Sequence, residues 1–123
     1  MYALLPVLVL GCAQPDPSCD AMCEAAASLY GACLEDWGVS WEAAGFVDEV
    51  DFVGRCETWA WEMHLLEDAA VDRGDLDKAG IVDETCATRE VALSAEDATC
   101  AAYTDIDWST VPWDPEPDAP PTE

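Results

Sequence analysis

The stretch SCDAMCEAAASLYGACLEDW, residues 18–37, decides the fold. At about 100° per residue, one narrow stripe of this segment holds three cysteines, an alanine and two aromatic residues: Cys19, Cys23, Ala26, Tyr30, Cys33 and Trp37. Ser18 stands at its start as a candidate N-cap, and Gly38 follows its last turn. The pattern predicts a helix that buries all three cysteines on one face.

Two further segments have helical periodicity. Residues 48–73 end before Gly74 and are expected to bury one stripe of a second helix: Phe52, Cys56, Trp59, Met63, Leu66 and Ala70. Residues 81–93 predict a third helix, which carries Ile81, Val82, Cys86, Arg89 and Leu93. The stretch from Ser94 to Asp97 resembles a capping box, and it predicts a short fourth helix that includes Cys100 and Tyr103.

The remaining segments connect or extend these helices. Residues 38–46 contain a candidate cap, Ser40, and residues 75–80 are expected to form a polar turn. Prolines are concentrated after Trp108, so residues 108–123 are expected to be a disordered acidic tail. Because no stretch alternates in the manner of a strand, the expected fold class is all-α. The sequence predicts a small disulfide-stapled bundle of about four helices over residues 19–107.

The net charge of the chain is strongly negative, and the acidic residues are spread along it rather than confined to one tail. Asp and Glu number 27 against four Lys and Arg, which gives a formal net charge of −23. Such a surface repels phosphate backbones, so we expect no nucleic-acid partner. It attracts divalent ions, cationic ligands and basic proteins, although solubility or adaptation to salt explains the same acidity without any ligand.

The N-terminal segment ends in a motif that bears on location. Residues 1–11, MYALLPVLVLG, are uncharged, and their apolar run has the length of a signal-peptide core but is too short to span a bilayer. The tetrapeptide Val9-Leu10-Gly11-Cys12 at its end resembles the lipobox of bacterial lipoprotein precursors. The alternative is a general secretory signal peptide that leaves Cys12 as an ordinary cysteine.

The resemblance to lipoproteins implies a route and an anchor. It implies that the signal peptide, residues 1–11, is removed and that the Cys12 thiol carries a diacylglycerol group. Residues 12–18 would then form a lipidated tether between the membrane and the domain. Ala13, rather than an Asp, follows the cysteine, which in that family favours the outer membrane.

Cysteine usage also indicates an extracytoplasmic protein. Seven cysteines in 123 residues are typical of a small domain in an oxidising compartment. With Cys12 assigned to lipid, an even set remains: Cys19, Cys23, Cys33, Cys56, Cys86 and Cys100. Because the first three share one helix face, we expect each to bridge to one of the last three.

Possible metal and acid–base groups are few. His64, the single histidine, has Glu67 and Asp68 one turn away, and we interpret it as a surface imidazolium paired with acids. No C-x-x-C motif supports a zinc site. In DLDKAGIVDETC, residues 75–86, four positions match a calcium loop, but Ala79 and Cys86 stand where oxygen ligands are needed. We therefore expect no metal site and no cofactor.

Tryptophans are the other candidate recognition residues. Trp37 and Trp59 lie on the predicted core stripes. Trp41 and Trp61 are the best candidates for a partner-facing surface, although packing against a third or fourth helix is favoured for both.

No catalytic motif emerges from the sequence. The chain contains no nucleophile elbow, zinc-protease motif or phosphate-binding loop, and it has one histidine. We therefore expect no catalytic residues and no enzyme. The sequence favours a lipid-anchored envelope protein that acts as a non-enzymatic interaction module. The alternative is an acidic protein that binds calcium or another divalent cation with low affinity.

Overall fold

The computed structural model describes residues 17–113 of the chain. Its elements are four α-helices and one 3₁₀ helix: α1 (Pro17–Trp37), α2 (Glu49–Asp72), η1 (Leu76–Lys78), α3 (Ile81–Leu93) and α4 (Ala101–Thr104). No strand occurs within these residues, and three disulfides join the helices. The predicted all-α, disulfide-stapled bundle is confirmed.

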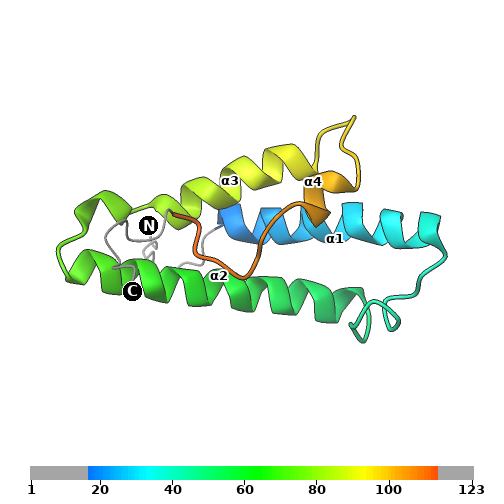
Figure 1. Cartoon of the computed structure of the whole chain (residues 1–123), viewed down its shortest axis with the longest axis horizontal. Coiled ribbons are helices and arrows are strands. Elements are labelled where there is room, and N and C mark those ends of the chain that lie inside the picture. Colours follow the sequence, from blue (N-terminus) through cyan, green and yellow to red (C-terminus); the bar gives the residue numbers. More distant parts are fainter. Residues whose placement is uncertain (1–16, 114–123) are drawn as a thin grey trace, which may run out of the picture.

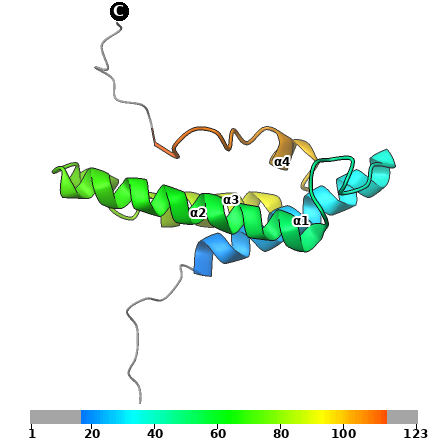
Figure 2. The ribbon, with the colours of Figure 1, turned by 90° about the horizontal axis from the view of Figure 1, so that it is seen from below.

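The long helix α2 runs along most of the molecule, and the other helices lie along it (Figure 1). The closest helix pair is α1 and α3, which pack side by side above α2 in this view. After α4 the chain returns across the bundle as an extended segment, residues 105–113, which we call the strap. Figure 2 shows the strap on the opposite side of the bundle from the start of α1.

Local side-chain contacts fix both ends of the connection between α1 and α2. The Ala43 amide donates to Ser40 Oγ at 3.0 Å, as expected of a capped turn. Asp48 is the N-cap of α2, and its Oδ1 accepts a 2.8 Å hydrogen bond from the Asp51 amide. Asp51 in turn accepts from the Val47 amide at 2.9 Å. The predicted bounds of the first three helices hold to within one residue.

The predicted capping box at Ser94 is wrong. Ser94 is the C-cap of α3, and its hydroxyl donates to the Glu90 carbonyl oxygen at 2.7 Å. A serine at a helix end readily donates back to the carbonyl four residues earlier, so its oxygen does not cap a following helix. The fourth helix begins only at Ala101 and is a single turn.

Each disulfide joins α1 to a different part of the fold. Cys19 is bonded to Cys86 in α3, Cys23 to Cys56 in α2, and Cys33 to Cys100 immediately before α4. This is the arrangement expected from three cysteines on one helix face. Each bridge contributes about 2–4 kcal/mol by restricting the unfolded chain, which is large for a domain of this size.

The core forms where α1, α2 and α3 meet, and its largest fully buried side chains are Met22, Cys23, Val82 and Cys86. Two residues predicted in the core are exposed instead. Trp37 ends α1 and is 51% exposed, with an edge contact to Tyr30. Leu66 is 45% exposed because the buried stripe of α2 passes through Glu67.

The ordered domain extends past the predicted boundary at residue 107. Trp108, Val111 and Trp113 in the strap are partly buried against the core, because this segment is rich in large apolar side chains. Residues 114–123, the signal segment 1–11 and Cys12 lie outside the described part. The last two residues of the predicted tether 12–18 belong to α1.

Within residues 17–113, no helix combines the length and apolar character needed to cross a membrane.

Candidate ligand-binding site

An apolar hollow of about 200 Å³ opens between α2, α4, the strap and the loop before α2. Its wall is made mainly of aromatic rings, with one disulfide sulfur and one guanidinium: Phe46, Phe52, Arg55, Cys56, Trp59, Tyr103 and Trp108. Sequence periodicity predicted the inward positions on α2. The aromatic residues of the loop and strap complete the hollow.

Ring contacts hold this wall together. Tyr103 stacks on Tyr30 of α1 with centroids 4.5 Å apart, and Phe52 packs between Phe46 and Tyr103 at 5.0 and 5.7 Å. These offset and edge arrangements are favourable for aromatic pairs. Large stiff rings meeting at such angles leave space between them, which is the origin of the hollow.

The strap is attached to α2 through one tryptophan pair. The indole N–H of Trp59 donates to the Trp108 carbonyl oxygen at 2.9 Å, and the two rings meet edge to face at 5.0 Å. Trp59 therefore has the predicted core role. Its indole supplies both an apolar contact and a hydrogen bond to the strap backbone.

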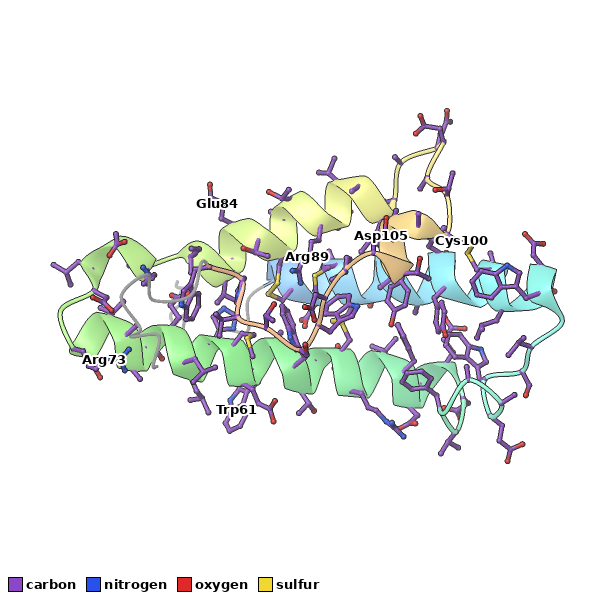
Figure 3. All side chains as sticks on the ribbon, in the orientation of Figure 1. Trp61, Arg73, Glu84, Arg89, Cys100 and Asp105 are labelled. Atoms are coloured by element: carbon purple, nitrogen blue, oxygen red, sulfur yellow. A yellow bond between two sulfur atoms is a disulfide. The ribbon has the colours of Figure 1, made fainter. Side chains whose placement is uncertain are left out.

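Two of the four basic residues of the chain flank the aromatic rings. The Arg55 guanidinium lies 5.0 Å from the centre of the Phe46 ring and pairs with Asp51 at 3.0 Å. The Arg89 guanidinium lies 5.3 Å from the Trp59 ring and 5.1 Å from the Trp108 ring. Figure 3 shows Arg89 between α3 and the strap. Half of the basic residues of the chain thus lie beside this hollow.

Burial changes the acid–base behaviour of two groups here. Burial, followed by the neighbouring Tyr30, raises the pKa of Tyr103 to about 12, so its hydroxyl stays neutral near pH 7. Burial lowers the pKa of Arg89, and the charge of Asp107 opposes that effect. The wall therefore offers apolar surface, fixed positive charge and hydrogen-bond donors, which are the features of a binding site.

His64 lies elsewhere, on α2 beside α3. Its Nε2 is 2.7 Å from Oδ1 of Asp83, and its Nδ1 is 3.0 Å from the Ala60 carbonyl oxygen. Since both ring nitrogens face acceptors, the protonated imidazolium satisfies both. Burial lowers the pKa of His64, but Asp83, Ala60 and Glu67 more than offset this, so the pKa is raised.

The pairing of the histidine with an acid is confirmed, but the partner that the sequence suggested is wrong. Glu67 is buried, and its two carboxylate oxygens accept from the Gly80 and Val82 amides, both at 3.0 Å. It caps the N-terminus of α3, where a negative charge is favourable. Asp83 comes from a different helix, which sequence spacing along α2 cannot indicate.

Three atoms that are possible metal ligands lie close together beside His64: one sulfur, one nitrogen and one oxygen. One ligand atom each from Cys19, His64 and Asp83 lie within 4.8 Å of one another. Because the Cys19 sulfur is bonded to Cys86, it does not offer the thiolate that a zinc site needs.

The calcium-like stretch adopts a different structure. Leu76–Lys78 form η1, and Asp83 lies in α3 opposite His64. An EF-hand loop holds its ligands around one point in a non-helical loop. Residues 75–86 instead consist of a 3₁₀ turn and the first part of a helix.

The two tryptophans singled out as surface candidates differ. Trp41 is partly buried against Tyr30 and Phe52, as packing predicted. Trp61 is 62% exposed, so packing was the wrong expectation for it. It projects from the outer side of α2 (Figure 3), where no other helix of the described part lies over it.

The sequence placed Arg89 on the third helix and Trp108 at the junction of the core and the tail, but it assigned neither residue to a binding site. A basic residue on the same face of α3 as Cys86 and Leu93 was the available signal, because a cation on a buried stripe needs a partner. Trp108 begins the predicted proline-rich tail, and the expectation that its ring closes the core is confirmed.

Comparisons with protein-family models, with curated proteins and with solved structures found no match to this chain.

Proposed function

We propose that this chain is a lipid-anchored extracytoplasmic protein that works as a non-enzymatic binding module of the bacterial cell envelope. The observation that carries the proposal is the division of the seven cysteines. Six are paired within the helical domain, and the seventh, Cys12, closes the apolar N-terminal run. An oxidising compartment accounts for the six, and lipid attachment accounts for the odd one.

The aromatic hollow supports the binding role. It is an apolar concavity with a few polar groups at its edge, which is the usual character of a small-molecule site. Its lining residues within the described part include no carboxylate and no imidazole, so the hollow favours binding over proton transfer. Rigid staples also suit a module exposed outside the cell, because they preserve the site at a formal charge of −23.

The intact mass of the protein from the membrane fraction of a bacterial host tests this proposal. We expect a mature chain that begins at Cys12, carries a diacylglyceryl group and an acyl chain, and gains six hydrogens on reduction of three bridges. Cys12→Ser should abolish the lipid without altering the bridges. A lipid-free wild-type protein in the soluble fraction would contradict the anchor.

One further variant tests whether the protein is anchored in the outer or the inner membrane. Ala13 follows the lipidated cysteine in the proposed mature protein, and in lipoproteins an Asp at that position favours the inner membrane. We expect wild-type protein in the outer-membrane fraction of a density gradient and Ala13→Asp in the inner-membrane fraction. Identical distributions would contradict the outer-membrane assignment.

A further inference from the structure

Two hydrogen-bond donors beside the hollow have no acceptor among residues 17–113. Nη1 of Arg89 and Nε1 of Trp108 are buried from solvent, and neither has a hydrogen-bond partner within the described residues. Buried donors are nearly always paired, because a donor that is removed from water without gaining an acceptor destabilises the fold. This cost is about 1–3 times the net stabilisation from one ordinary hydrogen bond. Two such donors in adjacent side chains indicate a missing acceptor.

The Arg89 cation also forms no close ion pair with another residue of the described part. Arg55 pairs with Asp51 at 3.0 Å and Lys78 with Asp77 at 3.2 Å. No carboxylate of the described residues lies within ion-pair distance of Arg89, whose closest recorded partners are the Trp59 and Trp108 rings. Asp107 acts on Arg89 electrostatically without forming one of these close pairs. A half-buried guanidinium with two rings and no close carboxylate beside it is well placed to donate hydrogen bonds to an anionic oxygen.

Trp108 connects the two unpaired donors to the hollow. This residue lines the hollow, and Arg89 lies 5.1 Å from the centre of its ring. The hollow measures about 200 Å³. An engineered apolar cavity of about 150 Å³ holds benzene, so this space suits one aromatic ring with a short substituent.

We propose that the hollow binds a small aromatic carboxylate. The ring of the ligand packs among Phe52, Tyr103 and Trp108, and its carboxylate accepts hydrogen bonds from Trp108 Nε1 and Arg89 Nη1. Because both nitrogens are buried, the strap shifts locally to admit the carboxylate. This inference rests on the proposed binding function and names its ligand class.

Local charge decides between an anion and a cation. The formal charge of −23 repels anions at long range, but salt screens that repulsion beyond about 8 Å at physiological ionic strength. Within that distance the hollow is flanked by Arg55 and Arg89. A cationic ligand would meet both guanidinium groups, whereas a carboxylate gives Arg89 the close ion pair that neither Asp107 nor another described residue forms with it.

The test is a nuclear magnetic resonance titration of the full chain with its three disulfides formed. Cys12→Ser serves as the parent protein, so that no lipid is attached. Phenylacetate is the probe, and ¹⁵N-labelled indole signals are the readout. We expect saturable shifts at Trp108 and Trp59, with Kd on the order of 1 mM for so small a ligand. The exposed Trp61 signal should stay in place.

Uncharged and cationic probes of the same shape isolate the role of the carboxylate. Phenylacetamide keeps the ring and one carbonyl oxygen, and it should bind at least about tenfold more weakly, because charged hydrogen bonds are roughly twice as strong as neutral ones. Phenethylammonium should bind more weakly still. This comparison uses unaltered binding residues, so it does not depend on the folding of any variant.

Variants then test the two donors. Trp108→Phe keeps a ring but removes the indole N–H, and Arg89→Gln removes the cation; each should weaken phenylacetate binding about tenfold. Arg73→Gln removes a charge at the far end of α2, labelled in Figure 3, and should leave binding unchanged. The remaining indole signals report whether each variant keeps the fold.

Several results would overturn the proposal. These are equal affinity for phenylacetate and phenylacetamide, tighter binding of phenethylammonium, and shifts that do not include Trp108. Self-association that Trp108→Phe abolishes, measured by sedimentation, would assign the hollow to a second copy of the chain. None of these results changes the mass of the membrane-bound protein, so failure of the ligand assignment is distinct from failure of the lipid anchor.

Discussion

The first half of α1 packs in a close-packed core, whereas its second half packs beside a hollow. In the first half, Met22 and Cys23 are fully buried against Val82 and Cys86 of α3 and their neighbours, and we call this region the closed end. In the second half, Tyr30 joins a group of large rings that surround the hollow, and we call this region the open end. The same helix thus begins in a solid core and ends beside a hollow.

The difference follows from side-chain shape. Cysteine, alanine and valine are small, and a disulfide brings two backbones close, with 4.8 Å between the Cα atoms of Cys19 and Cys86. Tryptophan, tyrosine and phenylalanine are wide and flat, so they meet at angles and leave gaps. We therefore expect the closed end to dominate stability and the open end to carry binding.

The largest expected effect comes from comparing two disulfides of equal span. Cys19–Cys86 at the closed end and Cys33–Cys100 at the open end both have a sequence separation of 67, so each should contribute about 4 kcal/mol through the unfolded chain. Replacing both cysteines by alanine at the closed end also leaves a cavity, which adds about 1 kcal/mol. Urea unfolding of the two double variants measures the difference.

The equal spans make each double variant the control for the other. Cys86 is fully buried whereas Cys100 is not, so we expect the closed-end variant to be the less stable of the two. It should be largely unfolded at 37 °C, while the open-end variant keeps a cooperative transition. Equal losses would show that the two ends contribute alike.

The second effect concerns a carboxylate at the closed end. Glu67→Gln replaces one of the two oxygens that accept from the Gly80 and Val82 amides with an NH₂ group, which leaves one amide without an acceptor. It also removes a negative charge at the start of α3. We expect a loss of about 1–3 kcal/mol in the free energy of unfolding, measured by urea titration.

Glu62→Gln is the matched control for that change. Glu62 is on the same helix but exposed, so its substitution should change the free energy of unfolding by less than about 0.5 kcal/mol. Similar losses in the two variants would mean that general charge, rather than the cap, accounts for the effect.

The contrast between Glu67 and the cysteines shows what the sequence reveals. Helical periodicity placed the first three helices and put three cysteines on one face, because burial of a stripe is encoded locally. The same periodicity gives no sign that Glu67 is buried, because its partners are backbone amides of another helix. The prediction that Trp37 is buried is wrong for a related reason. A stripe on a helix is buried only where a neighbouring helix extends far enough to cover it.

The third effect concerns the attachment of the strap at the open end. Trp59→Phe keeps an aromatic ring but removes the N–H that donates to the Trp108 carbonyl oxygen. We expect a loss of about 1 kcal/mol and faster amide hydrogen exchange in residues 105–113. Exchange in α3 near Val82 should stay slow. Uniform acceleration across the domain would mean that the strap unfolds only with the whole fold.

The position and shape of the hollow could not be predicted from the sequence, for a physical reason. Its walls come from α2, the loop before it, α4 and the strap, and only the α2 positions have a periodic signal. Trp108 and Trp113 lie in a segment whose prolines are typical of a disordered tail, yet their rings are large enough to pack on the core. Aromatic content was therefore a better guide there than proline content.

The smallest effect depends on pH and concerns the edge of the closed end. The pKa of His64 is raised above its ordinary value of 6.5, because Asp83, Ala60 and Glu67 together outweigh the opposing effect of burial. The protonated His64 therefore stabilises the fold fully below about pH 6.5, and this stabilisation is lost as the pH rises through the raised pKa. Asp83 is 53% exposed, so the contribution of the pair is below about 1 kcal/mol.

Urea unfolding of wild type and Asp83→Asn should differ most near pH 5.5 and least near pH 9. A difference that is constant across this range would mean that Asp83 acts through packing rather than through the charge of His64.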